Sequence, residues 1–153
     1  MPLPLAPHAL SILWPVFALA GWTLCILLLL AYRRVRATVK DKVGPRAYAL
    51  GESAQVPVGV TLANRNYMNL LELPLLFYVL CLMAYATGAA TAAPALVPLA
   101  WLYVLLRVLH SLVHVGYNHV MHRFAVFAAG NVVLTCLWLL LGRALLAASG
   151  GAA

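Results

Sequence analysis

Charged side chains are scarce in this sequence of 153 residues. Only 8% of the residues are charged, whereas 65% are hydrophobic, and the mean hydropathy is +0.97. This composition excludes a soluble domain and indicates a protein embedded in a membrane. The chain is long enough for a single domain, residues 1–153, but not for a large additional module outside the membrane.

Cysteine is also rare, and no two cysteines lie close together in the sequence. Cys25, Cys81 and Cys136 each fall within an apolar run. This spacing excludes a disulfide framework and a CxxC motif. The sequence also lacks a stripe of basic residues interleaved with aromatic residues, so we do not expect a nucleic acid as a partner.

The basic residues are concentrated in one segment. The formal net charge is +7, and six of the ten Lys and Arg residues lie close together in the first third of the chain: Arg33, Arg34, Arg36, Lys40, Lys42 and Arg46. In a membrane protein such a cluster is typical of a cytoplasmic loop, here residues 35–60.

Four hydrophobic stretches are each long enough to cross a bilayer as a helix. They span about residues 11–32, 61–86, 95–118 and 124–146. The predicted fold class is therefore an all-α membrane protein, a four-transmembrane-helix bundle whose backbone polar groups are bonded within the helices. Both basic connections then lie on the cytoplasmic side and both termini outside, in the inner (plasma) membrane if the source is bacterial.

Polar side chains interrupt the second hydrophobic stretch. Arg65, Asn69 and Glu72 are spaced i, i+4 and i+7, so a helix places them on one face. An ionisable group in hydrocarbon is costly, and such groups usually face a bundle interior or a water-filled cavity. These three residues therefore predict a functional site.

The third hydrophobic stretch carries a second polar stripe. Its members are spaced i, i+3, i+7 and i+10: Arg107, His110, His114 and Tyr117. Leu, Val and Ala fill most of the remaining positions of both helices. We expect the two stripes to face each other, because lipid is a poor environment for either of them.

Glu72 and Arg107 are predicted at similar depth, each roughly 15 Å from the cytoplasmic end of its helix. We expect them to form a structural ion pair, since each charge alone would be costly in the membrane. Arg65 and Arg123 then remain uncompensated nearer the surface. The result would be a polar, net-positive pocket that is open to the cytosol and suits a small anion.

A metal or haem site is an alternative for His110 and His114, which have the i, i+4 spacing of metal ligands. Residues 110–114 read "HSLVH" and so lack the glutamate of an HExxH motif. A complete ligand set is missing, and no metal is expected.

Two segments resemble the helix-two and helix-three motifs of the MAPEG family, the membrane-associated proteins in eicosanoid and glutathione metabolism. They are "RNYMNLLELP" at 65–74 and "RVLHSLVHVGYNHVMHRF" at 107–124. "YRR" at 32–34 resembles the basic end of the family's first helix. The likeness covers four helices, the loop placement and the length. Within the family, the sequence resembles a bacterial-type member.

The resemblance implies a homotrimer that binds glutathione between adjacent subunits near the cytosolic side. Arg123 would be the catalytic residue, in the place of the arginine that stabilises the glutathione thiolate. Arg34, or Arg33, would reach the ligand from the neighbouring subunit, and His114 stands where a tyrosine is common. The other glutathione contacts implied by the resemblance are Arg65, Asn69, Glu72, His110 and Tyr117.

The leading functional hypothesis is a glutathione-dependent membrane transferase or peroxidase. A thiolate stabilised by Arg123 would attack an apolar, lipid-soluble electrophile that enters from the bilayer. The alternative from another class is a non-catalytic lipid-binding or scaffold protein of the same fold. It predicts binding of a lipid or a partner without turnover.

Overall fold

The fold was analysed in a computed structural model, which describes residues 10–49 and 51–150. Four segments are long and apolar enough to cross a membrane, as predicted. One of these spans is divided into two helices, and two short helices lie in connections. In chain order the elements are α2 (Leu13–Lys40), the 3₁₀ helix η1 (Pro45–Tyr48), α3 (Val58–Leu71), α4 (Pro74–Ala86), α5 (Ala89–Ala92), α6 (Leu96–Val115) and α7 (Val120–Gly150).

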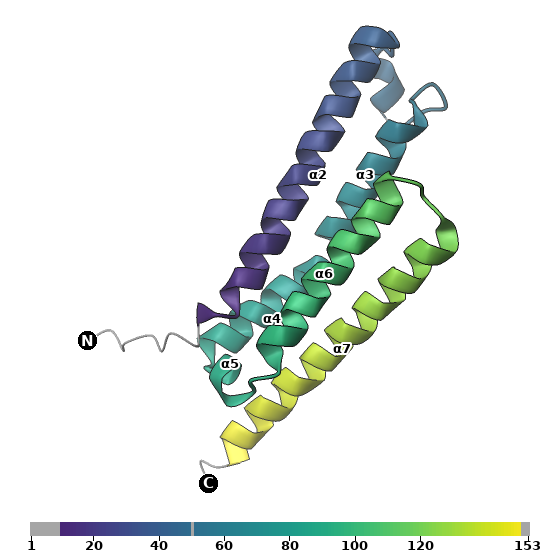
Figure 1. Cartoon of the computed structure of the whole chain (residues 1–153). Coiled ribbons are helices and arrows are strands. Elements are labelled where there is room, and N and C mark those ends of the chain that lie inside the picture. The colour runs from purple at the N-terminus through teal and green to yellow at the C-terminus, as the bar shows by residue number, and fades with distance from the viewer. Residues whose placement is uncertain (1–9, 50, 151–153) are drawn as a thin grey trace, which may run out of the picture.

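The spans run alternately up and down the bundle, so α2 begins and α7 ends at the same end (Figure 1). The α2–α3 and α6–α7 connections both lie toward the other end, and the α2–α3 connection extends farther out. Helix α6 packs along α7, and α2 packs against both α3 and α6. This arrangement confirms the four-helix bundle predicted from the hydrophobic stretches.

The first helix is longer than its hydrophobic stretch predicts, because it continues from Tyr32 to Lys40. Arg, Ala and Lys are good helix formers, so the helix does not end where the apolar run ends. Ala37 also packs into a small cluster with Val43 and Ala47 in the following connection. The predicted polar loop, 35–60, is therefore shorter, and part of it is helical.

The second span was predicted as one helix but is interrupted between α3 and α4. Proline has no backbone N–H and is tolerated in the first turn of a helix, and α4 begins at Pro74. Glu72 follows the last residue of α3 with ψ of −88°, outside the helical range. The interruption thus places a carboxylate at a break in the backbone, within the membrane-spanning part of the chain.

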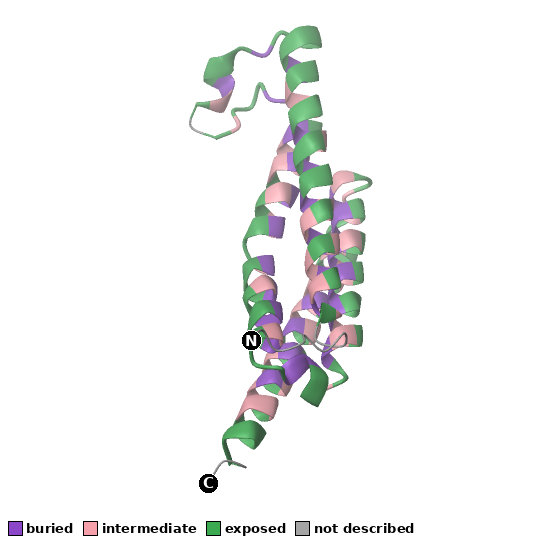
Figure 2. Cartoon of the chain, turned by 90° about the vertical axis from the view of Figure 1, so that its left-hand side faces the viewer, coloured by how far each residue is buried: buried purple, intermediate pink, exposed green. Residues whose placement is uncertain are grey.

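An apolar core holds α2, α4, α6 and α7 together. Leu19, Phe77, Leu80, Tyr103 and Leu137 are among its fully buried members, and the Phe77 and Tyr103 rings stack with centroids 4.7 Å apart. Figure 2 shows that the buried positions face inward, whereas the outer faces of the helices are exposed. Most of these exposed positions carry apolar residues, as lipid contact requires.

Arg33 joins three helices at the end of the bundle where the connections lie. Its guanidinium donates hydrogen bonds to the carbonyl oxygens of Gly59 (2.6 Å) and Val115 (3.4 Å). Val115 is the last residue of α6, where helical carbonyls lack partners within the helix and favour a cation. Arg33 thereby holds α3 and α6 in place relative to α2 at this end of the bundle.

Candidate functional site

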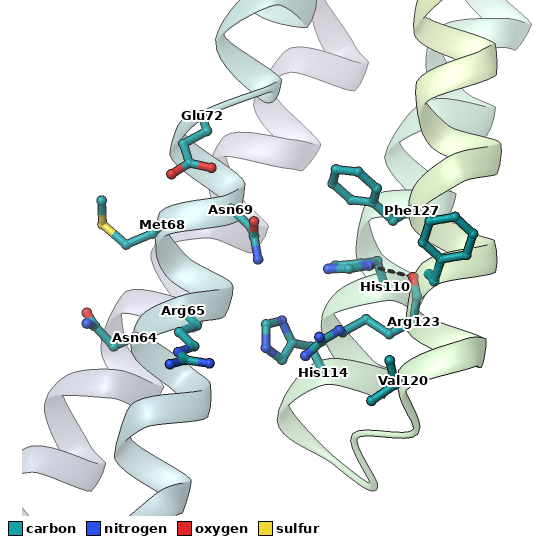
Figure 3. A pocket seen from close by; sticks show the side chains of 11 residues that line it. Asn64, Arg65, Met68, Asn69, Glu72, His110, His114, Val120, Arg123 and Phe127 are labelled. Carbon is teal, nitrogen blue, oxygen red and sulfur yellow. Dashed lines mark hydrogen bonds between the residues drawn. The ribbon is translucent and has the colours of Figure 1, made fainter. Parts of the chain in front are cut away.

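A cavity of about 490 Å³ lies between α3 on one side and α6 and α7 on the other (Figure 3). Its position near the starts of α3 and α7 places it toward the end of the bundle that carries the connections. Its wall is formed by Asn64, Arg65, Met68, Asn69, Glu72, His110, His114, Val120, Arg123, Phe124 and Phe127. The volume is within the usual range for small-molecule sites.

Helix α3 contributes the polar stripe predicted from its i, i+4, i+7 spacing. Arg65, Asn69 and Glu72 all line the cavity, so the prediction that they share one face is confirmed. Neither Arg65 nor the Glu72 carboxylate has a hydrogen-bond or ion-pair partner among the described residues. Both charges are therefore available to a ligand.

Helix α6 contributes two histidines whose rings meet edge to face, with centroids 5.6 Å apart. His110 Nδ1 lies 3.2 Å from the backbone carbonyl oxygen of Arg123, which can only accept, so Nδ1 carries the hydrogen (Figure 3). His110 Nε2 and both ring nitrogens of His114 are buried without a hydrogen-bond partner within the described ranges. Buried polar atoms need a partner, and here the cavity is where a ligand can supply one.

Helix α7 contributes Arg123 in its first turn. Asn118 precedes α7 in the left-handed region (φ 49°), which asparagine tolerates better than most residues. Its side-chain oxygen accepts a hydrogen bond of 3.0 Å from Arg123 Nη1. The tight turn between α6 and α7 thus orients the guanidinium toward the cavity.

The prediction of an ion pair between Glu72 and Arg107 is wrong, because no such pair forms among the described residues of the chain. Arg107 lies almost fully buried and donates a 2.8 Å hydrogen bond to Asn131 Oδ1 on α7. Its guanidinium carbon lies 5.0 Å from the ring centroids of both Tyr103 and Phe127. Arg107 reaches α7 instead of α3 because its long side chain finds an acceptor, Asn131, and the Phe127 ring there, while Tyr103 on α6 supplies a second aromatic face.

A glycine on α7 makes room for this contact. A Cβ atom built on Gly130 would lie 2.8 Å from Nη2 of Arg107, which is too close. The absence of a side chain at position 130 therefore lets the guanidinium pack against the α7 backbone. Spacing on α6 alone gives no sign of this, because the deciding residues lie on another helix.

Two further predicted site residues lie outside this cavity. Tyr117 follows α6, is largely exposed, and its hydroxyl lies 3.0 Å from Nδ1 of His122. Arg34 lies on α2, 3.7 Å from the carboxylate of Glu52 and stacked over Tyr48. The structure thus brings together six of the predicted residues: Arg65, Asn69, Glu72, His110, His114 and Arg123.

Several lining residues were not predicted as site residues. Asn64 and Met68 flank Arg65 on the face of α3, while Val120, Phe124 and Phe127 form an apolar wall on α7. The i, i+4, i+7 spacing of the α7 group is a detectable signal. It is hidden in the sequence because most positions of α7 are apolar.

The described residues contain no group of three or more His, Cys, Asp or Glu side chains placed to hold a metal ion. His110 and His114 are near each other but lack a third ligand of these types in the described parts of the chain. Their unpartnered nitrogens therefore point to hydrogen bonding in the cavity.

The chain belongs to the MAPEG family, since the family model matches residues 12–143. The family includes glutathione transferases and peroxidases, and its members generally use glutathione. The four apolar helices and this membership together make the protein an integral, multi-pass membrane protein. No curated protein and no solved structure matches the chain.

Proposed function

We propose that the protein is a glutathione-dependent transferase or peroxidase that acts on apolar electrophiles dissolved in the bilayer. The observation that carries this proposal is the cavity between α3, α6 and α7. Arg65, Glu72 and Arg123 converge there with the free nitrogens of His110 and His114. Ionisable groups at such a position in a membrane protein usually belong to a functional site.

The charges of the cavity fit glutathione, which carries two carboxylates, one ammonium group and a thiol. Arg65 suits a carboxylate, because a guanidinium binds that group with paired hydrogen bonds. The unpaired Glu72 carboxylate suits the ammonium group. Asn64, Asn69 and the two histidines supply neutral hydrogen-bonding groups for the peptide units.

Arg123 is the residue assigned to the thiol. A free thiol of the cysteine type has a pKa near ~8.5, so only a small fraction is thiolate at neutral pH. A fixed cation in a partly dehydrated site favours the thiolate, and each pKa unit gained gives about ten times more nucleophile. Asn118 holds the guanidinium in place and so keeps this charge directed at the cavity.

The apolar side of the cavity is the proposed entry for the electrophile. Phe124 and Met68 both line the cavity and are both exposed. A molecule dissolved in lipid can therefore reach the cavity sideways, between α3 and α7. A sulfur held at Arg123 lies beside Phe124 on the same helix, next to this entry, and such positioning lowers the barrier to reaction.

The proposal includes a homotrimer with its basic connections in the cytosol. Arg34 lies outside the cavity of its own subunit, as expected for a residue that reaches a glutathione bound to the neighbouring subunit. The six basic residues of the segment 33–46 favour the cytosolic side for this end of the bundle. Both termini then lie outside.

Calorimetric titration of glutathione into the purified, detergent-solubilised protein tests the binding step. We expect saturable binding by the wild type and a loss of at least tenfold in affinity for Arg65→Ala. Arg143→Ala is the matched control, because Arg143 is exposed on α7 and does not line the cavity. Absence of binding in a folded sample would overturn the proposal and favour a lipid-binding protein.

Turnover is measured separately with a chloronitrobenzene electrophile and with an organic hydroperoxide. Glutathione consumption with either substrate identifies the class of reaction, since conjugation and peroxide reduction use the same thiolate. Binding of glutathione without consumption of either substrate would refute the enzymatic part of the proposal. Light scattering of the same sample gives the oligomeric state.

A further inference from the structure

The two ring nitrogens of His110 have different surroundings. Nδ1 donates a hydrogen bond of 3.2 Å to the backbone carbonyl oxygen of Arg123, so Nε2 of the neutral ring carries no hydrogen and is an acceptor. Nε2 is buried and has no hydrogen-bond partner among the described residues. We infer that Nε2 of His110 takes the proton of the glutathione thiol, an inference that rests on the proposed function.

The ring of His110 is directed into the cavity. Figure 3 shows its hydrogen-bonded edge toward α7 and its other edge toward α3, across the space where a ligand fits. The residue is buried, and the centroid of its ring lies 5.6 Å from that of Phe127. The carbonyl and the phenylalanine ring together fix the plane of the imidazole. Nε2 is thus aimed at the ligand, as proton transfer from a bound group requires.

The hydrogen bond also couples the base to the residue that is assigned to the thiol. Arg123 accepts from His110 with its carbonyl oxygen and directs its guanidinium at the cavity. Asn118 holds that guanidinium, so one turn at the start of α7 positions both the cation and the base. A nucleophile and a base that is oriented by a third group form the arrangement used to activate nucleophiles in other enzymes.

His114 lacks such an orientation. Both of its ring nitrogens are buried without a hydrogen-bond partner within the described ranges, so no hydrogen bond selects its tautomer. Its ring meets that of His110 edge to face, without a hydrogen bond between them. We therefore assign the proton transfer to His110, while His114 remains a hydrogen-bonding group for the peptide units.

The proposed step is balanced in protons and charge. The S–H bond breaks, an Nε2–H bond forms, and the bonding electron pair stays on sulfur. Arg123 stabilises the thiolate, and the thiolate balances the charge of the imidazolium. The other ionisable groups that line the cavity are Arg65, Glu72 and His114.

The same proton then serves either electrophile. With a hydroperoxide, sulfur bonds to the terminal oxygen as the O–O bond breaks, and the imidazolium returns the proton to the leaving alkoxide. With a chloronitrobenzene, sulfur displaces chloride and the proton passes to water. Both routes restore the neutral ring.

Counting the protons released when glutathione binds tests the step. Calorimetry is run at neutral pH in two buffers that differ in their enthalpy of ionisation, and the ultraviolet absorbance of the thiolate is recorded on the same sample. We expect the wild type to form the thiolate with little release of protons to the buffer, because His110 keeps the proton.

His110→Asn should release about one proton for each thiolate formed. The asparagine amide keeps a donor toward the Arg123 carbonyl but has no basic nitrogen, so the proton must pass to the buffer. Its kcat should fall about 100-fold with either electrophile, which is within the usual range for loss of a general base. A merely structural role for His110 would not change the proton count.

Two further variants separate the histidines. His119→Asn is the matched control, because His119 is exposed in the α6–α7 connection and does not line the cavity, and it should match the wild type. His114→Asn should weaken glutathione binding without changing the proton count per thiolate. Release of a proton by this variant would move the role to His114.

The wild type alone can overturn the inference, whether or not the variants fold. Release of one proton per thiolate would show that His110 does not keep it, and an unchanged count in His110→Asn would show the same. Either result leaves glutathione binding and the thiolate in place and so refutes only this step. Absence of glutathione binding refutes the proposed function, and this step with it.

Discussion

Arg107 and Arg123 lie on opposite sides of the α6–α7 connection, and their surroundings differ. Arg107 is buried against Asn131, Tyr103 and Phe127, and its guanidinium does not reach the cavity. The Arg123 guanidinium has one hydrogen bond among the described residues, to Asn118, and Arg123 lines the cavity. One arginine is thus enclosed by the helices around it, while the other faces the space where a ligand fits.

This difference separates a structural charge from a functional one. Burial alone would have favoured Arg107 as the site residue, because a charge in a membrane interior usually marks a function. Two aromatic rings, the Asn131 acceptor and the space at Gly130 fix its position away from the cavity, while its Nε and Nη1 are buried without a hydrogen-bond partner among the described residues. Whether a charged side chain is available to a ligand indicates a functional role better than the depth of that side chain in the membrane does.

The largest expected effect is that of Arg107→Ala on stability. Loss of a large buried side chain should lower the free energy of unfolding by about 2–5 kcal/mol, because a cavity forms between α6 and α7. Thermal unfolding in detergent, followed by circular dichroism, measures this change. Arg143→Ala should be nearly neutral, and full stability of Arg107→Ala would show that the contact with Asn131 and the rings does not hold the helices together.

Arg123→Ala should lower turnover and leave stability unchanged, in contrast to Arg107→Ala. We expect unchanged unfolding and a loss of about 100-fold in kcat, comparable to removal of one group that stabilises a developing anion. Glutathione binding should weaken less than turnover does, because Arg65 and Glu72 remain. An unchanged rate of conjugation would show that Arg123 does not stabilise the thiolate.

Gly130→Ala tests how closely α7 approaches Arg107. The added methyl group would displace Nη2, which lies 2.8 Å from the Cβ position, and should destabilise the bundle by about 1–2 kcal/mol. Gly142→Ala is the matched control on the same helix, since a Cβ there meets nothing within 4 Å. The control should be neutral or stabilising by up to about 1 kcal/mol, because alanine favours a helix. Equal stability changes for both variants would argue against a tight fit at Gly130.

The smallest expected effect on stability is that of Glu72→Gln. The carboxylate is exposed and forms no ion pair with the described residues, so the free energy of unfolding should change by less than about 0.5 kcal/mol. Affinity for glutathione should fall about fivefold if the carboxylate binds the ammonium group. Calorimetry and thermal unfolding of the same sample measure both changes. Marked destabilisation would restore the pairing of Glu72 with Arg107.

Much of the candidate site could be predicted because its members repeat with the period of a helix. Arg65, Asn69 and Glu72 had to share a face once α3 formed, and the structure places them on one cavity wall. His110 and His114 followed by the same reasoning on α6. The apolar wall at Phe124 and Phe127 could not be predicted, because a cavity-lining phenylalanine and a lipid-facing one look alike in such a sequence.

The ends of the helices were predicted less well than their existence. Hydropathy locates the boundary of the membrane, but α2 passes this boundary and continues to Lys40. Continuation depends on helix propensity and on the packing of Ala37 against Val43 and Ala47, which hydropathy does not report. Pro74 indicates this break in the sequence, but the predicted helix, residues 61–86, includes it.

The sequence by itself determined the class of protein, the four spans, their alternating directions and the two polar stripes. These features depend on the thickness of the bilayer and on the helical repeat, which are the same for every chain. Only the tertiary structure decided that Arg107 turns to Asn131 and that Glu72 remains unpaired. A long side chain selects its partner from the helices around it, and its own helix does not specify where those neighbours place an acceptor, a ring or a gap.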